Sequence, residues 1–217
     1  MLDLTPDQLL STTRAVRKRL DFDTPVPDDV IRDCVRLAMQ SPSGSNNMTM
    51  QFVVVRDEAK RAAIADIYRS CFAIYETLDG VYVGSIKKDT EAEQAQQDRV
   101  TDSAKYLAET MQHVPALVLA CTTGGRLDGA PSIMSASILG NVIPAMWSFM
   151  LAARARGLGT VWTTIHLAYE REAAEILGIP YEEVTQAALI PLAYTVGTDF
   201  KLARRDPLET MVHWDTW

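Results

Sequence analysis

Cysteine and histidine are scarce in this sequence, with three of each among 217 residues. The cysteines, Cys34, Cys71 and Cys121, form no Cys-x-x-Cys pair, and an odd number of thiols cannot all be paired. Such cysteine usage is typical of a reducing compartment and argues against a disulfide scaffold, so we expect a cytoplasmic location. The histidines lie far apart without the spacing of metal ligands, and no metal site is expected.

Several familiar catalytic motifs are also missing. The chain has no Walker A loop, no His-Glu-x-x-His zinc motif and no Gly-x-Ser-x-Gly nucleophile elbow. The glycine-rich stretch 124–129 does not match the Gly-x-Gly-x-x-Gly dinucleotide motif. The sequence therefore gives no support to a hydrolase or a zinc enzyme.

Positive charge is in deficit, because 21 lysines and arginines face 28 acidic residues and leave a net charge of -7. A negative field disfavours nucleic acid and anionic membranes as partners. The uncharged stretch from Ile133 to Ala153 has the length of a bilayer span, but serines, Asn141 and Pro144 interrupt it. We therefore expect a buried core helix there and no membrane span. The N-terminus has neither the basic start nor the apolar stretch of a secretory signal.

Helix and strand patterns alternate along the chain. The residues 5–8 have the sequence of a helix cap, a second helix should begin at Pro27, and a short late helix should end at Gly178. Buried strands are expected at 51–55 and 115–121, and further strands at 160–165 and 187–196. The strand 187–196 is expected to be the last central strand, although Pro191 inside it suggests an edge or a bulge. These patterns predict one domain over residues 1–217, with a central sheet flanked by helices, in the α/β or α+β class.

Two polar segments stand apart from this alternation. The segment 78–97 is charged and contains two glycines, so we expect a surface loop or a lid that is partly helical. The tail 201–217 is aromatic and charged, and we expect it to wrap another surface.

The most unusual feature is a cluster of four cations, Arg14, Arg17, Lys18 and Arg19, in a protein of negative net charge. Arginine forks match the geometry of phosphate oxygens and keep their charge. The cluster is therefore either a phosphate site or a solvated basic helix end, and its own composition does not decide between them.

Three further segments are candidates for the same site. Pro42, Ser43 and Asn46 lie in a small polar loop that could approach a planar ring, or that could be a plain connecting turn. The strand that ends in Trp162, Thr163 and Thr164 could offer backbone groups and hydroxyls to a ring edge, or could be a core strand. A second cationic cluster at 201–205 could be part of the site or a solvated tail.

In their order and spacing, these segments resemble the motifs of the nitroreductase family. The segments 13–17 and 25–27 are similar to its Arg-Arg-Ser-Val-Arg opening and Pro-Val-Pro, and the segment 41–46 resembles its Ala-Pro-Ser-Gly-x-Asn loop. The strand 51–55, the long-helix exit 152–160, the late helix 176–180 and the basic element 204–208 follow in family order. The resemblance spans nearly the whole chain.

The resemblance implies an α+β, three-layer fold with a central, mostly antiparallel sheet, and a homodimer whose C-terminal tails are exchanged between subunits. It implies FMN at the subunit interface, with chemistry at flavin N5 and no catalytic acid or base from the protein. It implies that the long helix forms the dimer core. The residues that it implies for FMN binding are Arg14, Ala15, Arg17, Pro42, Ser43, Asn46, Trp162, Thr163, Thr164, Arg204 and Arg205.

The chain also departs from the family pattern at two places. Thr13 stands where the family usually has its first arginine, and Ala15 where it has serine, which puts one hydroxyl contact to the flavin in doubt. The segment 47–51 lacks the usual Gln-Pro-Trp, so the ring-side surface and the substrate pocket are expected to differ.

The resemblance leaves three functions open. The first is transfer of hydride from NADH or NADPH through FMN to a flat acceptor such as a nitroaromatic or a quinone. The second is reductive dehalogenation or flavin breakdown on the same fold, with the lid at 78–97 deciding between the reactions. The third is a flavin-storage or small-molecule-binding module without turnover.

Overall fold

A computed structural model describes all residues, 1–217. Its centre is a four-stranded sheet in the order β1-β2-β4-β3, and every pair of neighbouring strands is antiparallel. The strands are β1 (Met50–Val55), β2 (Ala116–Thr122), β3 (Leu158–Thr160) and β4 (Thr185–Tyr194). The α-helices are α1 (Pro6–Thr12), α2 (Asp28–Ala38), α3 (Glu58–Glu76), α4 (Glu91–Thr110), α5 (Ser132–Ala155) and α6 (Glu170–Leu177).

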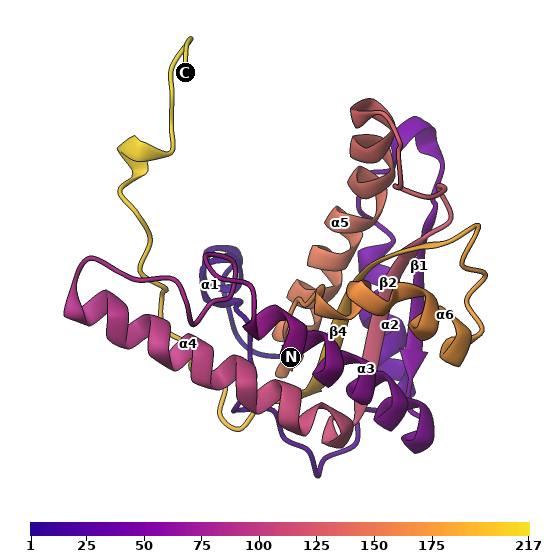
Figure 1. The fold of residues 1–217 in the computed structure, drawn as a ribbon, viewed down its shortest axis with the longest axis horizontal. Coiled ribbons are helices and arrows are strands. Elements are labelled where there is room, and N and C mark those ends of the chain that lie inside the picture. The colour runs from indigo at the N-terminus through magenta and orange to yellow at the C-terminus, as the bar shows by residue number, and fades with distance from the viewer.

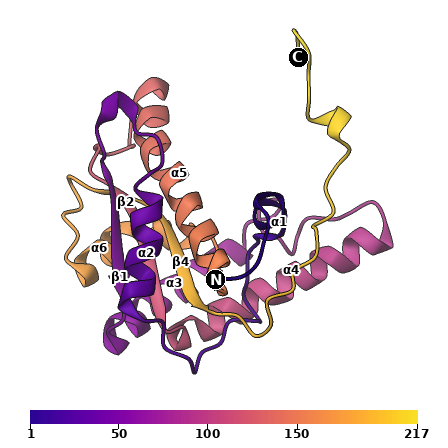
Figure 2. The same ribbon diagram turned by 180° about the vertical axis from the view of Figure 1, so that it is seen from behind.

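The helices cover both faces of the sheet, which gives three layers (Figures 1 and 2). Along β2, residues alternate between the faces, so Val118 packs against α2 and α5 while Leu117 and Leu119 pack against α3, α4 and α6. One hydrophobic cluster fills each side of the sheet. The expected three-layer α+β fold with an antiparallel sheet is confirmed.

Local signals place several helix ends where the sequence predicts them. The Thr5 hydroxyl accepts from the Gln8 backbone N–H, and the Gln8 side chain accepts from the Thr5 N–H, which completes a capping box. Helix α2 begins directly after Pro27. Helix α6 ends at Gly178, whose φ of 69° is the left-handed cap conformation that glycine favours.

The strands differ from expectation at two points. Strand β1 is an edge strand with the exposed side chains Gln51 and Val54, although we expected it to be buried. Strand β4 is central, as expected, even though it contains Pro191. Leu189 exchanges both backbone hydrogen bonds with Thr163, on the β3 side of β4. Backbone nitrogens two residues apart on a strand point to the same side, so the Pro191 nitrogen also faces the chain that follows β3. That nitrogen cannot donate, and β3 accordingly ends at Thr160 rather than continuing to residue 165.

Helix α5 runs along the sheet and meets the length and composition of a membrane span, with half of its most apolar window buried. Val142, Ala145, Met146 and Phe149 are fully enclosed between the sheet and α2. Other apolar side chains of α5 are exposed; they are Ile133, Met134, Ile143 and Trp147. The helix therefore has a core face and a bare apolar face.

Two segments lie away from this body. In the segment 78–97, residues from Glu91 onward belong to α4, which projects beyond the sheet, while 78–90 form turns and coil (Figure 1). Beyond residue 200 the chain leaves the body as an extended arm with a short 3₁₀ turn, Leu208–Thr210. We use the term arm for residues 201–217; their docking on a partner remains a prediction.

Candidate functional site

The cationic segment lies along the free side of β3. The Val16 N–H donates to the Thr160 carbonyl at 2.9 Å, and Ala15 forms a parallel bridge with Thr160. Val16 and Leu20 are buried in the core, which holds the segment in place. The segment 14–19, Ser103 of α4 and Phe200 line a hollow of about 280 Å³.

Two arginines of this hollow have no carboxylate partner. Arg14 donates through Nη1 to the Lys201 carbonyl at 3.1 Å, and Arg17 donates through Nη1 to Ser103 Oγ at 3.3 Å. Burial lowers the pKa of Arg17, but an arginine side chain keeps its proton at physiological pH. By contrast, Lys18 pairs with Asp102 and Arg19 with Asp199. Arg14 and Arg17 therefore bring uncompensated positive charge to the hollow, as a phosphate requires.

The lining of this hollow does not include Trp162, Thr163 or Thr164, which follow β3. Thr163 is buried and exchanges backbone hydrogen bonds with Leu189, and its Oγ1 is buried without a partner. Trp162 and Thr164 are exposed on either side of it. Gly159 fits closely here, because a Cβ would lie 3.0 Å from the Val16 Cβ. The pairing of Val16 with Thr160 thus places the arginine segment beside the end of β3.

The two arginines of the arm, Arg204 and Arg205, differ in their partners. Arg204 pairs with Glu93 at the start of α4, with 3.0 Å between Nη2 and Oε1. Arg205 meets only the Arg204 carbonyl at 3.4 Å. Arg204 is therefore held toward the α4 side of the hollow, whereas the Arg205 side chain has no acidic partner.

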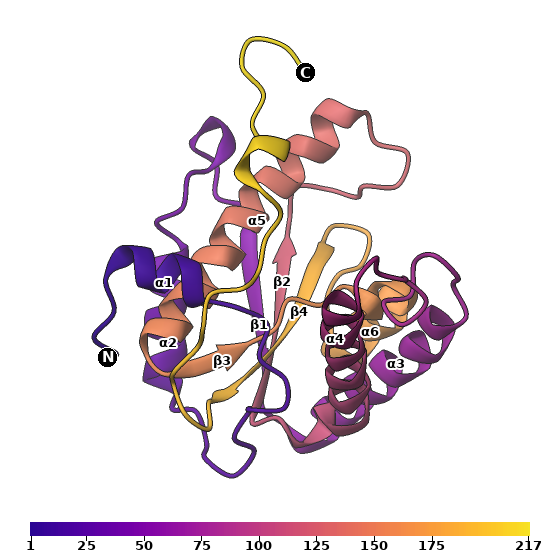
Figure 3. The ribbon, with the colours of Figure 1, turned by 90° about the vertical axis from the view of Figure 1, so that its left-hand side faces the viewer.

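The loop with Pro42, Ser43 and Asn46 does not reach the hollow in a single chain. The Gly44 N–H donates to Oδ1 of Asn141 on α5 at 2.9 Å, so the loop is tied to the first half of that helix. The arginine segment lies beyond the other end of α5, near β3 (Figure 3). At the rise of an α-helix, the fourteen steps from Asn141 to Ala155 span roughly 20 Å.

Sequence reasoning missed two residues that line the hollow and a third that supports one of them. Ser103 on α4 and Phe200 before the arm line it, and Arg154 of α5 lies against the Phe200 ring, 4.8 Å from its centroid. No motif marks these residues, because segments far apart in the chain bring them together. Arg154 also directly follows the uncharged stretch 133–153, whose pattern indicates a core helix rather than a charged site.

The titratable groups elsewhere offer no competing site. No group of three or more histidine, cysteine, aspartate or glutamate side chains is arranged to hold a metal ion. His166 is fully buried, and burial lowers its pKa to about 4. The three cysteines are buried and unpaired. The arginine-lined hollow is therefore the strongest candidate site.

Comparisons with solved structures show the same fold. Oxidized iodotyrosine deiodinase bound to FMN and 3-iodo-L-tyrosine is similar with a TM-score of 0.71 and 21% identity, over 96% of this chain and 98% of that one. A BluB-like flavoprotein from Clostridium difficile 630 is similar with a TM-score of 0.70 and 19% identity, over 98% and 100%. A nitroreductase-like family protein from Bacillus cereus is similar with a TM-score of 0.67 and 18% identity, over the full length of both chains.

Sequence comparison identifies the family. A search of curated proteins finds no match to this sequence. The model of the nitroreductase family, in contrast, matches residues 10–197, which include the arginine segment, the loop after α2 and the whole sheet. The chain belongs to the nitroreductase family, a family of oxidoreductases.

Proposed function

We propose that this protein is an FMN-dependent oxidoreductase whose cofactor phosphate binds at the hollow beside β3. The observation that carries the proposal is the pair Arg14 and Arg17, which face one hollow without any carboxylate partner. Their guanidinium donors suit a dianionic phosphate, and Ala15 offers backbone groups between them. Bound FMN would supply the redox chemistry, while the protein would bind it, orient it and exclude water.

The remaining predicted contacts would come from a second copy. The loop with Ser43 and Asn46 lies roughly 20 Å from the arginines along α5, so one chain cannot bring both to one flavin. In a homodimer packed through the bare apolar face of α5, the loop of one subunit could meet the hollow of the other. The exposed apolar side chains Ile133, Met134, Ile143 and Trp147 favour this packing.

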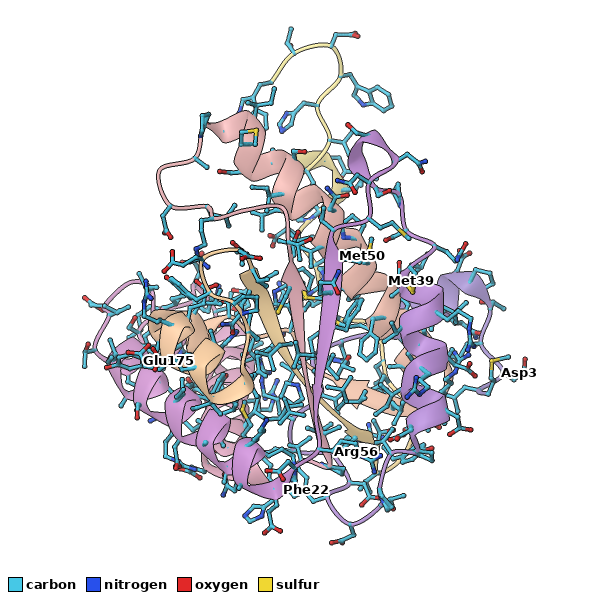
Figure 4. All side chains as sticks on the ribbon, turned by 90° about the vertical axis from the view of Figure 1, so that its right-hand side faces the viewer. Asp3, Phe22, Met39, Met50, Arg56 and Glu175 are labelled. Atoms are coloured by element: carbon cyan, nitrogen blue, oxygen red, sulfur yellow. The ribbon has the colours of Figure 1, made fainter.

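The arm also favours exchange between subunits. Its exposed apolar residues, Leu208, Met211 and Trp214, have no surface to cover within their own chain. A groove of about 980 Å³ lies between α2 and the open edge of β1. Met50 and Arg56, which are labelled in Figure 4, lie at the two ends of this edge. The groove contains Arg32 and Lys60 without acidic partners, whereas residues 206–217 carry three acidic residues and no lysine or arginine. We infer that the partner's arm binds this groove.

Cofactor content tests the first part. The purified protein should be yellow and release FMN on heating, and a colourless preparation should turn yellow with added FMN. A protein that stays colourless after FMN addition overturns the proposal.

Sedimentation tests the second part. The full chain should sediment as a dimer, and deletion of residues 206–217 should weaken the dimer and the flavin binding together. A full chain that is monomeric while it holds FMN would contradict the composite site.

For the reaction, we propose transfer of hydride from NADH or NADPH to a flat acceptor such as a nitroaromatic or a quinone. The similarity to iodotyrosine deiodinase and to a BluB-like flavoprotein favours a second candidate, reductive dehalogenation or flavin breakdown. Oxidation of NADH and NADPH should be measured with and without a quinone or a nitroaromatic. Turnover of a halogenated tyrosine, or loss of flavin under oxygen, would favour the second candidate. Tight FMN binding without any turnover would indicate a storage module.

A further inference from the structure

The residues just before the arm are held by two arginines that lie against one aromatic ring. The Arg19 guanidinium is 4.3 Å from the Phe200 ring centroid, and that of Arg154 is 4.8 Å from it. We call these three residues the Phe200 clamp. Arg19 comes from the cationic segment and Arg154 from the end of α5, so the clamp joins three distant parts of the chain at the wall of the hollow.

The same two arginines also bind the backbone of this region. Arg19 donates through Nε to the Val196 carbonyl at 2.8 Å and through Nη1 to the Asp199 carbonyl at 3.0 Å. Arg154 donates through Nη2 to the Thr198 carbonyl at 2.9 Å. Arg14 then continues the series at the Lys201 carbonyl. Residues 196–201 are thereby fixed against the segment that carries Arg14 and Arg17.

Arg154 is unusual because it is buried without a counter-charge. Its relative exposure is 4%, it forms no ion pair, and its Nε and Nη1 atoms have no hydrogen-bond partner. A buried cation with unmet donors is unfavourable unless its charge or its contacts serve another purpose. Here its face supports the Phe200 ring, and its Nη2 holds the Thr198 carbonyl.

We propose that Phe200 is a positioning residue that makes the hollow selective for a phosphorylated flavin. Clamped by Arg19 and Arg154, it fixes the backbone at 198–201 so that Arg14 is held at the hollow and Arg204 is directed toward α4. Loss of the ring frees this backbone and disperses the cations that a phosphate needs. The inference rests on the proposed FMN site, and it concerns the phosphate end of the ligand alone.

The test compares FMN with riboflavin, which lacks the phosphate, on the full-length protein. Dissociation constants for both flavins are measured by titration for the wild type and for Phe200→Leu, which keeps apolar bulk but removes the aromatic face. Phe200→Tyr is the conservative variant. Val196→Ala is the matched control, because Val196 is exposed in the same segment and its backbone bond to Arg19 remains.

The wild type should bind FMN more tightly than riboflavin, by roughly tenfold or more. Phe200→Leu should reduce that ratio by about tenfold through weaker FMN binding, while riboflavin binding stays within about twofold. Phe200→Tyr and Val196→Ala should keep the wild-type ratio. Equal losses for both flavins, or an unchanged ratio, would overturn the inference and leave the FMN site standing. A wild type that binds neither flavin would remove the FMN site itself.

Discussion

The backbone N–H of Gly44 donates a 2.9 Å hydrogen bond to Oδ1 of Asn141, so a buried amide of α5 carries the loop of Ser43 and Asn46. The Asn141 Nδ2 donates in turn to the Ser137 carbonyl at 3.2 Å. The loop is strained, because Ser45 and Asn46 both have a φ of 54° in the left-handed region. One side chain thus sets the position of a loop that we assign to the flavin of a second copy.

Asn141→Ala should therefore loosen this loop. Removal of the amide leaves the Gly44 N–H without its partner, and we expect a loss of about 1–3 kcal/mol in unfolding free energy. Flavin binding should weaken as well, since the loop leaves its position. Urea unfolding and an FMN titration measure the two effects. Ser137→Ala is the control, because it keeps the carbonyl that Asn141 uses; equal effects in both variants would contradict the role given to the amide.

Arg14→Ala should weaken FMN binding by about ten- to a hundredfold, since a charge-assisted hydrogen bond contributes about 1.5–3 kcal/mol. Titration of the apoprotein with FMN gives this value directly. Arg99 of α4 is exposed and has no partner, so Arg99→Ala removes the same charge without touching the hollow. If both variants lose affinity alike, general charge rather than a site at Arg14 explains the binding.

A paired-charge cluster fixes the loop after β2. Arg126 and Glu170 form two parallel bonds of 2.9 and 2.7 Å, with side-chain exposures of only 18% and 13%. Arg126 also lies 4.0 Å from the Tyr181 ring centroid. Glu170→Gln should lower the unfolding free energy by about 2 kcal/mol, because it removes the bidentate carboxylate and leaves the sheltered Arg126 with only the exposed Asp128 as an acidic partner, at 3.2 Å.

Urea unfolding checks this value, with Arg171→Ala as the control. Arg171 pairs with Glu182 at the surface, where the exposures are 58% and 76%, and lies 4.1 Å from the Tyr181 ring centroid, so its loss should cost about 1 kcal/mol. A smaller effect for Glu170→Gln than for Arg171→Ala would show that the bidentate pair does not stabilise the fold.

His166 should make stability fall in acid. Burial lowers its pKa from 6.5 to about 4, so the unfolded chain takes up a proton at a higher pH than the folded chain does. Its contribution is complete above pH 6.5 and is lost as the pH falls toward 4. Between pH 7.5 and pH 5 this amounts to about 2 kcal/mol.

Unfolding free energies at pH 7.5 and pH 5 should therefore differ less in His166→Gln than in the wild type. An unchanged pH dependence in His166→Gln would mean that the buried imidazole does not titrate as described.

Much of the fold follows from local chemistry that the sequence displays. The capping box at Thr5 and the glycine at 178 act over a few residues, so helix ends could be predicted. The end of β3 could not be predicted, because it is caused by Pro191 on the neighbouring strand β4 and not by the residues 160–165 themselves. Propensity favoured a longer strand, and tertiary pairing prevented it.

For the candidate site, too, local features could be predicted and contacts between distant segments could not. Arg14 and Arg17 could be singled out because their charge is local to one segment. The Phe200 clamp could not, since Arg19, Arg154 and Phe200 meet only in the folded chain. The separation of Asn46 from the arginines was equally hidden, because sequence order does not show that the two groups lie near opposite ends of α5.

The open edge of β1 has a consequence for handling the protein. Met50 to Val55 contains no charge, proline or glycine, and its outer backbone groups have no strand beside them. Such an edge is a template for aggregation, and only the flanking Arg56 and Asp57 oppose it. Dilution or removal of the arm should therefore produce insoluble protein sooner than loss of the flavin alone.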